Sequence, residues 1–222
     1  MSDHSIKLAN LLLSGEEQLA ITHIHTVLTE NDRLTLYEDL LTPAMTYIGK
    51  LWERNEITVA DEHLATAICD FIISDFEFRS SSKEQGNRKK VMLFGVEGEE
   101  HYIGLKMASA VFQEFGWSVR YLGPNLPLRH AETAANAWQP DVIAMSAALS
   151  YRLPTLKKSV QVLSQTAGHP TVLIGGRMAP HVHFEEEAAS GPGQVIIMSN
   201  LRELHRWLTF AQEGVGTINA FS

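Results

Sequence analysis

The sequence predicts an α/β protein of two domains: an N-terminal four-helix bundle, then a flavodoxin-like (Rossmann-like) parallel sheet with helices on both faces. Two observations support this. Apolar residues recur at three- and four-residue spacing up to about Phe78, and short apolar runs then alternate with helical patterns. A polar stretch, RSSSKEQGNRKK at Arg79–Lys90, separates the two patterns and is typical of a linker. We therefore place the domains at residues 1–80 and 88–222.

The first domain is expected to contain four helices. They are predicted at Ser5–Leu13, Glu16–Glu30, Arg33–Glu53 and Val59–Phe78. Gly15 and the Asn31–Asp32 pair interrupt the helical pattern, and Thr58 is a suitable N-cap for the last helix. Because the connections are short, the helices should pack as an antiparallel bundle.

The second domain is expected to form a parallel sheet, because its strands are nearly continuous runs of Val, Ile and Leu. The strands are predicted at Val91–Val96, Ser118–Leu122, Val142–Ser146, Thr171–Ile174 and Val195–Met198. The helices are predicted at Glu100–Phe115, Leu128–Ala137, Leu153–Ala167 and Leu201–Gln212. Such sheets bind ligands beyond the carboxyl ends of their strands, so functional residues are expected in the loops there.

Composition excludes several classes of protein. The 222 residues are 45% hydrophobic and 20% charged, which is typical of a folded globular chain. The net charge of −8 disfavours direct nucleic-acid binding. No apolar run is long enough for a membrane span and no signal peptide is recognisable, so we expect a cytoplasmic protein. The single cysteine, Cys69, allows neither an internal disulfide nor a Cys-based zinc site.

The loop after the first strand carries the most informative residues. His101 follows Glu99 by two residues and precedes Gly104 by three, which gives E-x-H-x-x-G. A neutral imidazole is a good ligand for a transition metal, and a nearby carboxylate can accept its other N–H and fix its tautomer. A glycine lets a bulky ligand approach the backbone. The alternative is an ordinary solvent-facing loop histidine.

This loop resembles the signature D-x-H-x-x-G of the cobalamin-binding domain family, with Glu99 in place of the aspartate. Two further markers follow in the family's order: Ser146 after the third strand, and Gly175-Gly176 after the fourth. Each taken singly also fits ordinary turn chemistry at a strand end. The resemblance implies that cobalamin is the cofactor and that His101 displaces the dimethylbenzimidazole base and ligates cobalt from below.

The resemblance also implies roles for the other markers. Ser146 would hydrogen-bond the displaced nucleotide tail, and Gly175 and Gly176 would make room for it. The family's S-x-L motif is incomplete, because Ala148 stands where the leucine is expected. The serine that extends the histidine–carboxylate relay in methionine synthase falls on Arg152, so we do not transfer that role.

The helical bundle resembles the cap over the upper face of cobalamin in methionine synthase and its relatives. Trp52 is followed after nine residues by Glu62-His63, the pattern of CarH-type adenosylcobalamin photoreceptors. By resemblance, Trp52 shields the adenosyl group of adenosylcobalamin, Glu62 hydrogen-bonds it and His63 supports it. Alternatively, Trp52 is a half-buried aromatic residue of the bundle, and Glu62 and His63 are an exposed pair in the first turn of a helix. Glu53 replaces the histidine that captures cobalt after illumination in CarH proteins.

Three functional hypotheses follow, of which the first is preferred. In the first hypothesis, the chain is a light sensor that binds adenosylcobalamin in the dark and changes its cap packing or oligomeric state after photolysis. A MerR-type DNA-binding domain like that of CarH is not expected, so the chain is expected to signal through a regulator protein partner or as a homo-oligomer. The second hypothesis is a corrinoid methyl-carrier subunit of a methyltransferase system, and the third is an interaction domain without a cofactor. None makes the chain itself an enzyme, and no catalytic residues are assigned.

Some candidate residues receive little weight. On a helix, side chains two residues apart point in different directions. His23 and His25 should therefore not converge on a metal, and we expect both at the surface. His181 and His183 precede three glutamates and fit a solvated charged turn. Arg177 could reach a phosphate or an amide group of a ligand.

Overall fold

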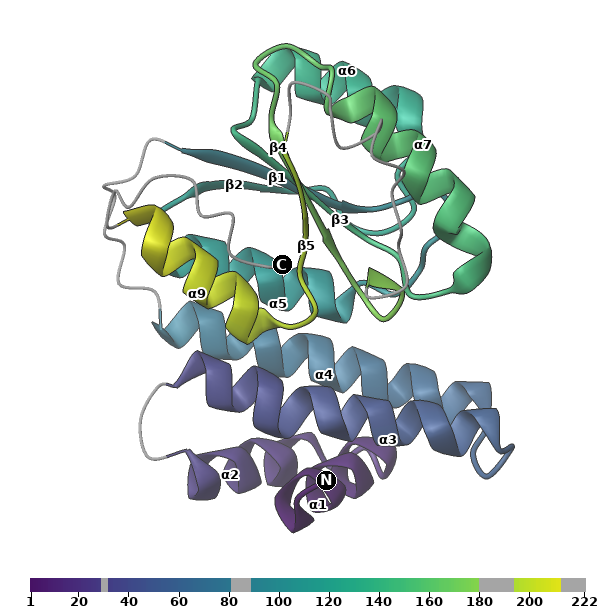
Figure 1. Cartoon of the computed structure of the whole chain (residues 1–222). Coiled ribbons are helices and arrows are strands. Elements are labelled where there is room, and N and C mark those ends of the chain that lie inside the picture. Colours follow the sequence, from purple (N-terminus) through teal and green to yellow (C-terminus); the bar gives the residue numbers. More distant parts are fainter. Residues whose placement is uncertain (29–31, 81–88, 180–193, 213–222) are drawn as a thin grey trace. The chain divides into compact units, whose positions relative to one another are not determined.

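The computed structural model of the chain describes residues 1–28, 32–80, 89–179 and 194–212. The chain divides into two compact units, residues 1–82 and 83–222 (Figure 1). Most of the predicted linker, residues 81–88, lies outside the described residues. Among the residues that the structure covers, no helix combines the length and the apolar character needed to cross a membrane.

The first unit is helical. Its α-helices are α1 (Asp3–Leu13), α2 (Glu17–Val27), α3 (Thr42–Glu53) and α4 (Val59–Ser80). Thr58 is the N-cap of α4, as predicted: its Oγ1 accepts a hydrogen bond from the Asp61 backbone N–H, and the Asp61 carboxylate accepts from the backbone N–H of Thr58 at 2.8 Å. This reciprocal cap fixes the start of α4.

The predicted helix over residues 33–53 differs from the structure in one respect. Thr35–Leu41 is a π-helix, in which the Thr42 backbone N–H bonds the Tyr37 carbonyl five residues back, and α3 begins only after it. Pro43 stands in the first turn of α3 and has no N–H to donate. In a continuous α-helix its ring would press on the carbonyl four residues earlier, and the wider π turn avoids that clash.

The second unit is a five-stranded parallel sheet with strand order β2-β1-β3-β4-β5, the flavodoxin-like order that the sequence predicted. The strands are β1 (Lys90–Gly95), β2 (Ser118–Tyr121), β3 (Val142–Ser146), β4 (Thr171–Gly175) and β5 (Val195–Ile197). The α-helices are α5 (Ile103–Glu114), α6 (Leu128–Trp138), α7 (Leu153–Leu163) and α9 (Leu201–Gln212), and Ser150–Arg152 forms the short 3-10 helix η2.

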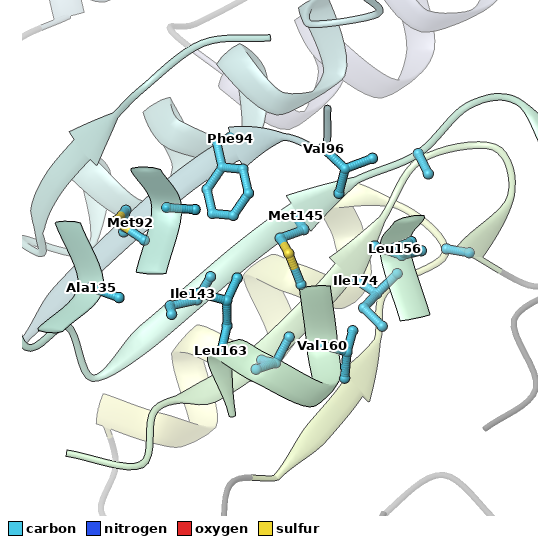
Figure 2. Packing of buried hydrophobic residues seen from close by; sticks show 14 residues of the cluster. Met92, Phe94, Val96, Ala135, Ile143, Met145, Leu156, Val160, Leu163 and Ile174 are labelled. Carbon is cyan, nitrogen blue, oxygen red and sulfur yellow. The ribbon is translucent and has the colours of Figure 1, made fainter. Parts of the chain in front are cut away.

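The central strands are buried on both faces, which explains their continuous apolar character. Met92 and Phe94 of β1 pack with Leu156 and Val160 of α7 on one face of the sheet (Figure 2). Val91 and Leu93 point to the opposite face, where α5 and α9 contribute apolar residues such as Phe112, Leu204 and Leu208. Because both faces are covered by helices, ligands can reach the sheet only at its strand ends.

Candidate functional site

The predicted site residues of the second unit meet at the carboxyl edge of the sheet. Gly95 at the end of β1 is the register partner of Ser146 on β3, and Ser146 is in turn the partner of Gly175 on β4. The loops that leave these three strands therefore start side by side. The Glu99–His101 loop, Ser146 and the two glycines are brought together as the sequence order predicted.

Glu99 is the buried anchor of this edge. Its carboxylate is 0% exposed and accepts three hydrogen bonds: from the His101 ring Nδ1 at 2.6 Å, from the His101 backbone N–H at 2.9 Å, and from the Ala148 backbone N–H at 2.6 Å. Burial by itself raises the pKa of the Glu99 carboxyl, but the hydrogen bonds from His101 and Ala148 outweigh it and hold that pKa below its usual value. Glu99 is therefore an ionised acceptor.

His101 lies between Glu99 and solvent. Its side chain is 52% exposed, and its second ring nitrogen, Nε2, lies 3.2 Å from Nη2 of Arg177. A guanidinium can only donate, so Nε2 accepts this hydrogen bond and the ring proton sits on Nδ1, facing Glu99. The hydrogen bond from Nδ1 to Glu99 thus fixes the orientation of the ring, and the lone pair of Nε2 points away from Glu99. A metal-ligating histidine requires this arrangement.

Asn125, in the loop after β2, braces the His101 loop and was not singled out by the sequence analysis. Its side-chain oxygen accepts from the Gly98 backbone N–H at 2.7 Å, its side-chain nitrogen donates to Glu100 at 2.9 Å, and its backbone N–H donates to the Glu99 carbonyl at 2.9 Å. Asn125 has φ 55°, a left-handed conformation that asparagine tolerates. The sequence signal for it was only a G-P-N turn.

Ser146 carries an unusual polar atom. Its Oγ is buried and has no hydrogen-bond partner within the described residues. Buried hydroxyls are normally paired, so an orphan at a strand end is suited to a ligand group. Gly104 and Gly175 add to this picture, because a Cβ on either one would have no atom within 4 Å. The site therefore offers a buried hydroxyl without a described partner at Ser146 and open space at Gly104 and at Gly175.

Arg152 stands where the family's relay serine is expected. Its long side chain makes contacts that a serine could not reach. Its guanidinium packs directly on Gly98, in the space that a Cβ there would occupy, and lies over the Tyr151 ring at 4.9 Å from the ring centroid. Gly98 also has φ 79°. This glycine therefore admits the arginine next to the His101 loop, and the position provides a cation instead of a hydroxyl.

The other three predicted site residues belong to the helical unit. Trp52 lies next to the end of α3 and is 48% exposed, and Glu62 and His63 lie in the first turn of α4. Glu62 accepts hydrogen bonds from the His63 ring at 2.8 Å and from the Thr66 hydroxyl at 2.9 Å. Because α3 and α4 are consecutive, the three residues occupy the same end of the bundle.

One expectation about histidines is wrong. His23 is buried, its ring Nε2 lies 3.0 Å from the His4 carbonyl, and its ring stacks on that of His4. Only His25 is exposed, because successive i and i+2 positions of α2 face opposite sides. His181 and His183 lie outside the described residues. Within the described ranges, no group of three or more His, Cys, Asp or Glu side chains is placed to hold a metal ion.

Comparison with known proteins adds independent information. A model of the B12 binding domain matches residues 89–201, and a second B12 binding domain model matches residues 7–74. Dimethylamine corrinoid protein 1 of Methanosarcina acetivorans is 22% identical over 176 residues, which cover 78% of this chain and 83% of that protein. A corrinoid protein of Desulfitobacterium hafniense is 23% identical over 191 residues, with 83% and 88% covered.

A transcriptional repressor and a solved structure are also similar. The HTH-type transcriptional repressor CarH of Myxococcus xanthus is 26% identical over 167 residues, and the match spans 69% of this chain but only 54% of CarH. The structure of the Methanosarcina barkeri monomethylamine corrinoid protein matches with a TM-score of 0.72 and 15% identity, over 92% of this chain and 96% of that chain. At that identity the likeness concerns the fold alone.

Proposed function

The chain belongs to the B12-binding protein family, and from this premise we propose that it binds a corrinoid and serves as a methyl-carrier subunit that works with methyltransferases. The observation that carries the proposal is the buried Glu99 behind the outward-facing Nε2 of His101. A bound corrinoid supplies a cobalt centre that can accept and donate a methyl group. In this proposal His101 would hold the cobalt through Nε2.

The residues at the sheet edge fit such a cofactor. Glu99 accepts the Nδ1 proton of His101 and so makes Nε2 a better electron-pair donor. The unpaired Oγ of Ser146 suits a hydrogen bond to the nucleotide tail. The open space beside Gly104 and Gly175 suits the approach of a large planar ring and its tail. The Ser146 role rests on a buried hydroxyl without a partner among the described residues, and the role of the two glycines rests on unfilled space.

The relatives favour the carrier hypothesis over the light sensor that the sequence analysis preferred. The matches to corrinoid proteins span more than four-fifths of those relatives, and one of them is named for dimethylamine, a methylated amine. The match to CarH spans 54% of that repressor. We therefore place the light sensor second and propose a methyltransferase as the partner.

A specific observation keeps the light sensor as a second candidate. Trp52, Glu62 and His63 keep the CarH-type spacing, and all three are placed at one end of the helical unit. An exposed aromatic, a carboxylate and an imidazole at one end of the bundle suit a nucleoside such as the adenosyl group of adenosylcobalamin. In this function the chain would act on a regulator protein or change its oligomeric state after illumination.

A lower-ligand test separates protein ligation from the cofactor's own base. We propose loading the protein with methylcobinamide, which lacks the nucleotide base, desalting it in the dark and recording its absorption spectrum. Ligation by His101 should give the six-coordinate spectrum in wild type and the five-coordinate spectrum in His101→Ala. An identical spectrum in both proteins would refute ligation by His101, and failure of the wild type to retain any corrinoid would refute both functions.

A second experiment discriminates between the two functions. A carrier should bind methylcobalamin equally well in wild type and in Trp52→Ala, and illumination of its adenosylcobalamin complex should yield only the product that free cofactor gives. A light sensor should lose adenosylcobalamin selectively in Trp52→Ala and should form a distinct, stable protein-bound product. Thr66→Ala is a matched control, because it removes a partner of Glu62 without removing the aromatic.

A further inference from the structure

The lone pair that a cobalt ligand needs is already engaged in the protein alone. Nη2 of Arg177 lies 3.2 Å from Nε2 of His101, across 76 residues of sequence. Since the guanidinium has no acceptor, the lone pair of Nε2 receives its hydrogen bond. Arg177 and a metal ion would therefore compete for one pair of electrons.

The position of Arg177 is built by the backbone around it. Gly176 has φ 95°, and a Cβ at this residue would lie 2.6 Å from the Ala147 carbonyl oxygen, so only glycine lets the turn approach so closely. The Met178 backbone N–H donates to the same Ala147 carbonyl at 3.2 Å. The next residue, Ala148, donates its backbone N–H to Glu99. One short segment after β3 thus holds both the turn that carries Arg177 and the carboxylate that orients His101.

We propose that Arg177 is a positioning residue that acts as a latch on His101. In the cofactor-free protein it holds Nε2 in the ligating tautomer and covers its lone pair. If His101 ligates cobalt through Nε2, that lone pair would no longer accept from Arg177, and the Arg177 side chain would have to leave His101. The second half of this proposal rests on the proposed ligation of cobalt by His101, whereas the first half concerns the protein alone.

The latch predicts the reactivity of Nε2 without any cofactor. Diethyl pyrocarbonate acylates the unprotonated nitrogen of histidines, and peptide mass spectrometry resolves the rate at each one. The experiment is done at pH 8, above the range in which ordinary histidines titrate, which is about pH 6.5. Arg177→Ala should raise the acylation rate of His101 about two- to fivefold, the size expected for losing one solvent-exposed hydrogen bond. Arg177→Lys, which keeps a cationic donor, should restore part of the protection.

A matched control exists in the same unit. Nε of Arg129 lies 3.2 Å from Nε2 of His130, the same kind of contact at the same distance. Arg129→Ala should raise the acylation rate at His130 and leave His101 unchanged, and Arg177→Ala should do the reverse. An unchanged rate at His101 in Arg177→Ala, with circular dichroism showing an intact fold, would overturn the latch.

Methylcobinamide binding tests the displacement. Arg177→Ala should bind this probe about two- to fivefold more tightly than wild type, because no hydrogen bond has to be broken first. Unchanged or weaker binding, with the six-coordinate spectrum still lost in His101→Ala, would overturn the displacement while the proposed ligation stands. If instead His101→Ala kept that spectrum while the acylation results held, the ligation and its displacement step would fail and the cofactor-free latch would stand.

Discussion

The chain contains two Glu–His pairs with similar hydrogen bonds but different surroundings. Glu99 bonds the His101 ring at 2.6 Å, and Glu62 bonds the His63 ring at 2.8 Å. The Glu99 side chain is 0% exposed and also accepts two backbone N–H groups, whereas Glu62 is 31% exposed and His63 75% exposed. The first pair is fixed by the fold, and the second lies on the outer surface of one helical turn.

This difference explains why the same two residue types suit different tasks. A carboxylate with three donors keeps its position and its charge, so its histidine has one tautomer and one orientation. A pair on an exposed helical turn competes with water, and its hydrogen bond contributes little to stability. The sheet-edge pair is suited to ligating a metal, and the bundle pair is suited to adjusting to a polar group on a ligand.

Exchanging each glutamate for glutamine should give the largest contrast. Glu99→Gln removes the negative charge behind His101 and should weaken cobalt ligation about 10- to 100-fold, the usual effect of losing the outer partner of a metal-bound histidine. Glu62→Gln should leave ligation unchanged. Titration of both variants with methylcobinamide, followed by absorption, measures this. Equal effects of the two substitutions would contradict the distinction between the pairs.

Gly175 and Gly176 provide a second test of the buried Glu99–His101 pair. Only Gly176 makes the close backbone contact that supports this pair. Gly176→Ala should destabilise the second unit by about 2–3 kcal/mol, since it adds a Cβ against the Ala147 carbonyl in a left-handed conformation. Gly175→Ala meets nothing within 4 Å and should change stability by less than about 0.5 kcal/mol. Urea unfolding of both variants measures these two changes in the free energy of unfolding. Similar losses of stability would show that the close approach at Gly176 is unimportant.

The helical turn that carries Glu62 and His63 depends on its cap. Thr58→Ala removes the side-chain cap of α4 and should lower the stability of the helical unit by about 1 kcal/mol. Thr58→Ser keeps the hydroxyl and should stay close to wild type. Thermal unfolding monitored by circular dichroism compares the three proteins. If Thr58→Ser lost as much stability as Thr58→Ala, the methyl group and not the cap would be responsible.

The smallest expected effect concerns acid. Hydrogen bonds hold the pKa of Glu99 in the folded protein below its usual value, so ionised Glu99 stabilises the fold at neutral pH. That contribution is lost as the pH falls through the lowered pKa. The free energy of unfolding of wild type should therefore decline more steeply than that of Glu99→Gln below about pH 4.5. Parallel declines measured by urea unfolding between pH 3 and 6 would contradict it.

Much of the fold could be predicted because its signals are local. The starts of β2, β3 and β4 and both ends of α9 coincide with the apolar patterns, and Thr58 caps α4 as its sequence context indicated. The signature of the loop at Glu99 and His101 could be found for the same reason, since three residues within one loop carry it. The π turn before α3 was missed, because an apolar helical pattern does not distinguish a π turn from an α turn.

The sequence by itself determined the order of helices and strands, the parallel sheet and the presence of a histidine and a glutamate at one strand end. These features depend on the spacing and type of residues that are close together in the chain, so the sequence alone predicts them. Only the tertiary structure decided that the Ala148 N–H reaches Glu99 across 49 residues and that Arg177 reaches His101 across 76. These contacts depend on strand register and on the close turn at Gly176, which bring distant segments together at one edge of the sheet.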